Sequence, residues 1–169
     1  MKFMKLFPVL ASLSIFASGT ALAQTYTQSA TKDLAVNANV KTSCAIDTVA
    51  VTFPDYDPTA GTAVNNSGGS VKIKCSKGSV TPIGLDLGKG PNGTRQMKGP
   101  GLSGTEYLSY ELYKAANDVW GNASGTWMIP AASQKSTAWA TFAILATIAA
   151  NQDVSVGAYT DTVTATVNF

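Results

Sequence analysis

The clearest pattern in the chain is a strict alternation of apolar and polar residues over positions 162–169. Its apolar members are Val163, Ala165, Val167 and Phe169. A period of two with β-branched residues predicts a half-buried strand. Because no partner strand follows it, we expect an open edge or gap beside it that recruits a strand from another chain.

A second alternation lies near the other end of the chain, where Leu34, Val36, Ala38 and Val40 are spaced by polar or small residues. The pattern continues to Ile46 and is long for a single strand. We expect its first part either to serve a second sheet or to lie outside its own domain. The boundary is expected between Val36 and Ala38.

Shorter alternations predict further strands at positions 49–53, 71–75, 83–87, 108–113 and 138–150. The last is rich in alanine, which favours helix, but its large apolar residues keep a period of two and favour strand. Two prolines and two aspartates at 54–58 predict a turn, and the Gly-, Asn- and Ser-rich positions 59–70 predict a loop. Short strands separated by turns, without a convincing helix, predict an all-β sandwich.

The first 23 residues are typical of a secretory signal peptide. A basic start at Lys2 and Lys5 precedes a short apolar run, and Ala21-Leu22-Ala23 is a small-x-small cleavage site. The apolar run is too short for a membrane anchor. We therefore expect residues 1–23 to be removed on export, which leaves one domain's length of chain.

Composition narrows the function further. Without Lys2 and Lys5 the charges balance, and the low charge content argues against nucleic acid or a polybasic membrane role. Cys44 and Cys75 are the only cysteines. In an exported protein such an isolated pair predicts one disulfide, with two free thiols as the alternative.

The residues needed for familiar catalysis are missing. The chain has no histidine, which excludes Ser-His-Asp and Cys-His arrangements and leaves two lone sulfurs short of a metal site. Asp55 and Asp57 are interpreted as turn formers. Packing is favoured over sugar stacking for the tryptophans, which are Trp120, Trp127 and Trp139. We expect neither an enzyme nor a bound cofactor or metal.

An ordered set of motifs resembles the spore coat protein U domain family, which includes subunits of archaic chaperone–usher (Csu-type) pili. The set is Cys44-Ala45-Ile46, Val51-Thr52-Phe53, Val71-Lys72-Ile73-Lys74-Cys75, Arg95-Gln96-Met97, Leu108-Ser109-Tyr110-Glu111-Leu112-Tyr113, Trp120-Gly121 and Gly157-Ala158-Tyr159-Thr160-Asp161-Thr162-Val163. The resemblance covers nearly the whole mature chain. It departs from the family near Leu145-Ala146 and Ala149, where a Tyr-Gly and a Pro are frequent.

The resemblance implies an incomplete immunoglobulin-like β-sandwich that lacks its last strand. A periplasmic chaperone, and later a neighbouring subunit at the outer-membrane usher, would complete it. Residues 24–36, with an uncertain boundary, would be the donor segment, and 37–169 the pilin domain. The implied donor residues are Leu34, Val36 and Ala38; the implied acceptor-groove and chaperone-contact residues are Val163, Ala165, Val167 and Phe169.

The function that follows is a non-enzymatic subunit of a cell-surface pilus, which polymerises by donor-strand exchange for attachment and biofilm formation. The alternative from another class is a secreted β-sandwich that binds carbohydrate as a complete monomer. The sequence leaves open whether a pilus subunit of this kind is major or minor.

Overall fold

The computed structural model describes residues 28–102, 104–132 and 137–169. The predicted signal peptide, residues 1–23, lies outside them. The chain divides into an N-terminal segment up to Ala38 and a domain from Asn39 to Phe169. In the N-terminal unit, residues 28–38 have no regular secondary structure.

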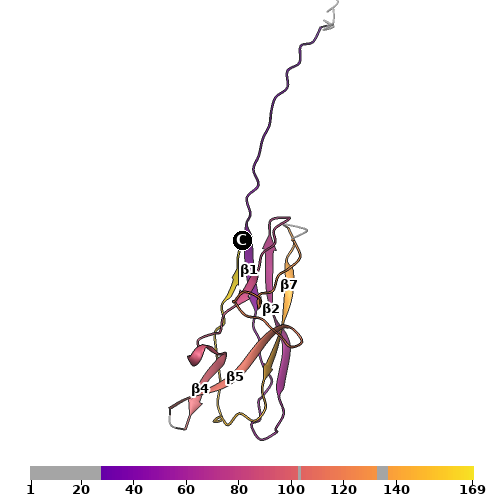
Figure 1. The fold of residues 1–169 in the computed structure, drawn as a ribbon. Coiled ribbons are helices and arrows are strands. Elements are labelled where there is room, and N and C mark those ends of the chain that lie inside the picture. The colour runs from indigo at the N-terminus through magenta and orange to yellow at the C-terminus, as the bar shows by residue number, and fades with distance from the viewer. Residues whose placement is uncertain (1–27, 103, 133–136) are drawn as a thin grey trace, which may run out of the picture. The chain divides into compact units, whose positions relative to one another are not determined.

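One antiparallel sheet dominates the domain (Figure 1). Its strand order is β1 (Cys44–Val49), β2 (Val64–Cys75), β7 (Ala140–Ile148), β5 (Gly104–Ala115) and β4 (Gln96–Gly101), and the short β6 (Asp118–Val119) pairs with β5. We call this the main sheet. Its inward-facing residues alternate with outward-facing ones, as the period of two requires.

A smaller second layer pairs β3 (Ile83–Leu85) with β8 (Ala165–Val167). Two single bridges lie next to it: Ile83 of β3 pairs with Met128, and Lys98 of β4 in the main sheet pairs with Thr160. A short 3₁₀ turn, η1 (Pro91–Gly93), lies between β3 and β4. The core fills the space between the layers and contains Val71, Ile73, Ile83, Leu85, Leu112, Trp120, Ile144 and Ala146.

The predicted all-β sandwich is confirmed, and so are strands within positions 71–75, 83–87, 108–113 and 138–150. β7 is a strand despite its alanines, because its alternate residues face the core: Ile144, Ala146 and Ile148 are buried. Propensity for helix is a weak preference that tertiary packing overrides.

Three boundary predictions were wrong. Positions 64–70 are the first half of β2 and not loop, because Asn66 to Gly69 form a β-bulge that lets a Gly-rich segment pair with β7. Positions 50–53 leave β1 and carry no strand, although a strand was predicted over 49–53. The last strand covers only Ala165–Val167 of the predicted 162–169.

The predicted disulfide is confirmed. Cys44 and Cys75 lie directly opposite each other in the β1–β2 register, with their Cα atoms 4.1 Å apart. Ser76, next to Cys75, bonds to the backbone at Lys41 and Ser43. The start of the domain is therefore fixed to the end of β2 by a covalent bond and by hydrogen bonds.

Replacing both Cys44 and Cys75 with alanine should destabilise the domain. The bond spans a sequence separation of 31, and a loop of that length restricts the unfolded chain by about 3–4 kcal/mol. Urea denaturation should show a lower midpoint for the double variant, and reduced wild type should match it. An unchanged midpoint would contradict a stabilising role for this disulfide.

Candidate functional site: an open groove over the core

A groove with a volume of about 1060 Å³ lies between two stretches of chain, residues 48–58 and 154–165. We call it the core groove. Its floor is the inner face of the main sheet together with β3, through Val71, Leu85, Leu112, Ile144 and Ile148. These same side chains belong to the buried core of the domain. The sandwich is therefore covered on this side by two separated stretches of chain.

The first wall forms because the chain leaves β2 after Val49. β1 pairs with β2 only as far as Ser70, immediately beyond the bulge. Past that point Val51 packs directly over Gly69, where a Cβ atom would collide with it. The Asn66 amide donates to the carbonyl of Thr52 and fixes the wall from the bulge side.

At one end of the groove a tyrosine of the first wall bonds to the loop that leads into the second wall. The hydroxyl of Tyr56 accepts a hydrogen bond of 2.8 Å from the backbone N–H of Gln152. The Gln152 amide in turn bonds to both backbone groups of Ser109 on β5. Over the floor, the rings of Phe53 and Tyr110 meet edge to face with centroids 6.3 Å apart.

The second wall presents backbone groups as well as apolar side chains to the groove. Asp86 donates its N–H to the carbonyl of Thr164, and Asn168 donates to that of Pro82. Within the C-terminal stretch, these hydrogen bonds are made by even-numbered residues. Because bonding direction alternates along an antiparallel strand, the N–H and C=O groups of Val163 and Ala165 point the other way, toward the groove.

Two carboxylates hold this wall against the loop that follows β3. Asp86 accepts from the backbone N–H groups of Thr164 (2.8 Å) and Gly88 (2.9 Å). Burial alone would raise the pKa of Asp86, but these hydrogen bonds outweigh it and hold the pKa below its usual value.

The second carboxylate, Asp161, accepts from the N–H of Lys89 and from the hydroxyl of Tyr110, both at 2.7 Å. Burial, followed by the bond to Asp161, raises the pKa of Tyr110 and keeps its phenol protonated. Gly88 has φ +76°, and a side chain there would collide with the Asp161 carboxylate.

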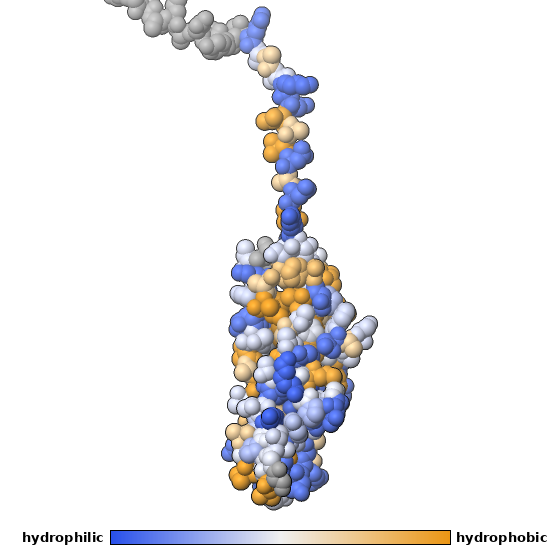
Figure 2. Space-filling view, turned by 90° about the vertical axis from the view of Figure 1, so that its left-hand side faces the viewer, coloured by the Kyte–Doolittle hydropathy of each residue, from blue (hydrophilic) through white to orange (hydrophobic). Residues whose placement is uncertain are grey.

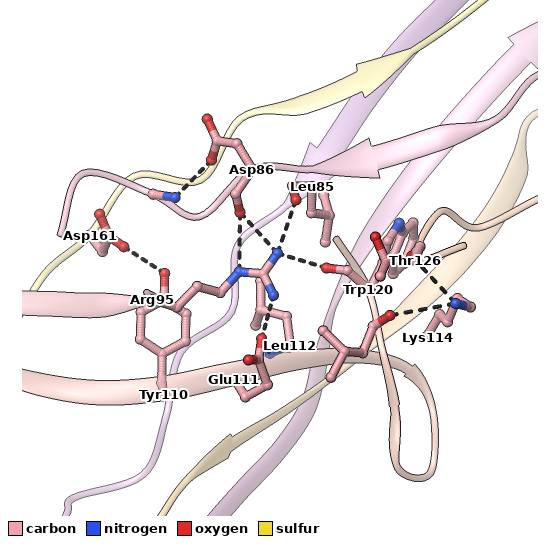
Figure 3. A network of polar contacts seen from close by, with 12 residues as sticks. Leu85, Asp86, Arg95, Tyr110, Glu111, Leu112, Lys114, Trp120, Thr126 and Asp161 are labelled. Carbon is pink, nitrogen blue, oxygen red and sulfur yellow. Dashed lines mark hydrogen bonds and ion pairs between the residues drawn. The ribbon is translucent and has the colours of Figure 1, made fainter. Parts of the chain in front are cut away.

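A buried arginine joins the two layers beside the groove (Figure 3). The Arg95 side chain bonds to the carbonyl oxygens of Leu85, Asp86 and Trp120 at 2.7–3.1 Å. It also pairs with the carboxylate of Glu111 on β5. Trp120 is fully buried, and its indole N–H donates to the carbonyl of Ile83 at 2.9 Å.

The four C-terminal residues expected to line one groove do not all do so. Val163 and Ala165 line the core groove. Val167 packs against the core next to it, and Phe169 is 67% exposed and lies outside the lining. Sequence reasoning missed the polar supports Asp86, Gln152 and Arg95, although the Arg95-Gln96-Met97 motif pointed to the last of them.

The expected donor residues belong to the N-terminal unit. The side chains of Leu34 and Val36 are 86% and 84% exposed, and Ala38 is exposed as well. Figure 2 shows apolar and polar residues alternating along this segment. Their function stays a prediction at this point.

Two of the remaining candidates make local contacts within the domain. Asp57 accepts from the N–H and hydroxyl of Thr59, which is the turn expected of it. Trp139 lies under the ammonium of Lys74 at 5.2 Å. Within the described ranges there is no group of three potential metal ligands, and no helix there is long and apolar enough to cross a membrane.

The class defined by this fold is an all-β sandwich with an open groove over its core. Residues 30–166 match the model of the Spore Coat Protein U domain, so the chain belongs to that family. It is 30% identical to Protein U of Myxococcus xanthus over 182 residues, which covers 94% of this chain and 96% of that protein.

A solved structure with a similar fold is the CsuC-CsuE chaperone–tip adhesion subunit pre-assembly complex from archaic chaperone–usher Csu pili of Acinetobacter baumannii. The similarity has a TM-score of 0.55 and 26% identity and covers 77% of this chain. The chain matches only 40% of the length of that protein chain.

Replacing Asp86 with alanine should loosen the second wall. The N–H groups of Thr164 and Gly88 would lose their partner, at a cost of about 1–3 kcal/mol for buried donors and less where water reaches them. Asp153 is an exposed aspartate, so Asp153→Ala is a control with the same charge change. Hydrogen exchange at Thr164 should speed up in Asp86→Ala alone; equal exchange in both variants would contradict the role.

The same carboxylate should make stability depend on pH. Its pKa is lower in the folded than in the unfolded state, so its contribution is complete above the unfolded value, about 4, and is lost as the pH falls. The difference in unfolding free energy between wild type and Asp86→Ala should therefore shrink in acid. Urea denaturation from pH 7 downward measures it, and a constant difference would refute the link.

Proposed function

We propose that this protein is a structural subunit of a chaperone–usher pilus that polymerises by donor-strand exchange. The observation that carries the proposal is the core groove, whose floor is the buried core itself. Family membership and the similarity to a chaperone–tip subunit complex support it. Family and fold alike are those of structural subunits, and we propose no catalytic role.

The groove suits an extended strand better than a compact ligand. It follows two antiparallel stretches of chain and offers the backbone groups of Val163 and Ala165 along one wall. A strand laid there would bond to this edge and place every second side chain on the apolar floor.

The N-terminal segment has the matching pattern. In an extended chain Leu34, Val36 and Ala38 point to one side, and Leu34 and Val36 are almost fully exposed. Burying a leucine or valine contributes roughly 1.5–3 kcal/mol each before the cost of ordering the segment. We propose that this segment fills the groove of a second copy or of a related subunit.

A donor and an acceptor on one chain give head-to-tail contacts that do not close on themselves, so the product is a fibre. Before assembly the apolar groove would expose an aggregation-prone edge. We propose that a periplasmic chaperone covers it, that an outer-membrane usher exchanges the chaperone for the next subunit, and that the fibre serves attachment and biofilm formation at the cell surface.

Leu34→Asp tests the donor. A carboxylate in an apolar groove costs several kcal/mol if unpaired, so fibre assembly should fail while the chaperone complex still forms. Ala35→Asp introduces the same charge on the opposite side of the extended segment and should assemble normally. Electron microscopy of surface fibres and chaperone co-purification provide the two measurements.

Two results would overturn this proposal. Normal fibres from Leu34→Asp would place the donor elsewhere. A wild-type protein that accumulates as a stable monomer without any chaperone would favour the alternative of a complete, monomeric carbohydrate-binding domain.

A further inference from the structure

We propose that the outer face of the main sheet carries a binding site for a neutral saccharide. The site is a hollow with a volume of about 510 Å³, and the lining residues used below are Asn65, Ser67, Tyr113, Asn117, Leu145 and Thr147. We call it the outer hollow. The described residues that line it are all different from those that line the core groove.

The β-bulge of β2 forms one side of the outer hollow. Asn66 pairs with Ala146 and Gly69 with Ile144, so two residues of β2, Ser67 and Gly68, face the single Leu145 of β7. Such a bulge bends its strand and interrupts the pleated surface. The depression is therefore built into the backbone and does not depend on the rotamer of one side chain.

The hairpin turn between β5 and β6 forms the opposite side. Asn117 occupies this turn with φ +60°, a conformation that asparagine tolerates better than most residues. Tyr113 lies at the start of the turn and pairs with Leu145 across the sheet. The side chains of Tyr113 and Leu145 are half-buried, and together they make an apolar platform at the base of the hollow.

Hydrogen-bonding groups surround this platform. The Thr147 hydroxyl donates to the carbonyl oxygen of the Asn65 side chain at 2.7 Å, which orients the Asn65 amide. Its NH₂ group can then donate to a ligand. Ser67 and Asn117 are exposed and offer a further hydroxyl and a further amide.

This chemistry selects an uncharged ligand with both apolar and hydroxyl faces. Among the described residues that line the hollow, no side chain is ionised, so a charged ligand would find no counter-charge from them. A pyranose ring has an apolar face that packs on a tyrosine ring and hydroxyls that pair with amides. The volume falls within the usual range for small-molecule sites.

The outer hollow is available whatever fills the core groove. Tyr113, Leu145 and Thr147 alternate along their strands with Leu112, Ile144 and Ala146, which face the core. The two sites therefore lie on opposite faces of one sheet. The inference does not rest on the proposed pilus function.

Saturation-transfer NMR with the full mature protein tests the proposal, since the method works for monomers, complexes and fibres. The probes are glucose, galactose, mannose, N-acetylglucosamine and their disaccharides, with glucuronic acid as the charged comparison. We expect transfer to at least one neutral sugar at millimolar concentration and none to glucuronic acid.

Variants assign the binding to the outer hollow. Tyr113→Ala should weaken it by about tenfold or more, the equivalent of 1.4 kcal/mol, and Tyr113→Phe should retain it because the ring remains. Tyr107→Ala removes an exposed tyrosine outside the hollow and is the matched control. Asn65→Asp keeps the side-chain shape but adds a charge, so it should also lose binding. It provides the test if Tyr113→Ala fails to fold.

Three outcomes would overturn the inference. The first is an absence of transfer to every neutral sugar. The second is binding that survives both Tyr113→Ala and Asn65→Asp. The third is equal or stronger transfer to glucuronic acid, which would show that the ligand is chosen by charge.

Discussion

The domain is held together across its layers by directional bonds. The core groove leaves part of the apolar core without a covering strand, so packing of side chains is the weaker tie between the layers on that side. Arg95 adds a second tie beside the groove, because one buried guanidinium binds three backbone carbonyls and the Glu111 carboxylate. A buried cation is stable only when its donors are satisfied in this way.

The other supports follow the same logic. The disulfide fixes the start of β1, Asp86 and Asp161 fix the last segment, and Gln152 ties the loop before it to β5. Each bond holds a wall of the groove, or the chain that leads into one, to a strand of the main sheet or to the loop after β3. The walls can therefore keep their separation without a strand between them.

The sequence predicted those parts of the fold whose signal is local. Val71 to Cys75 and Ile144 to Ile148 alternate because one face of their strands is buried, and that pattern is visible without a structure. The Cys44–Cys75 pair was predictable from the chemistry of an exported protein with two cysteines.

Long-range features were not predictable in the same way. The bulge at Asn66–Gly69 has the composition of a loop, and only pairing with β7 makes it a strand. Arg95 can be buried because backbone carbonyls from distant segments converge on its guanidinium. No residue spacing in the sequence indicates that convergence. Phe169 continues a perfect alternation, yet the strand ends at Val167 and the Phe169 side chain is exposed outside the groove lining, so the alternation predicted too long a wall.

The β-bulge of β2 has two roles, one on each face of the sheet. On the inner side it marks the place where β1 parts from its neighbour, and on the outer side it makes the depression above Leu145. Removing one residue from it would leave a single residue opposite Leu145 and restore a regular ladder, so the bend in β2 and the depression would both be lost. A change in the number of residues at this bulge would therefore alter both faces of the sheet. Among related sequences, insertions or deletions should be far rarer there than in the surrounding loops.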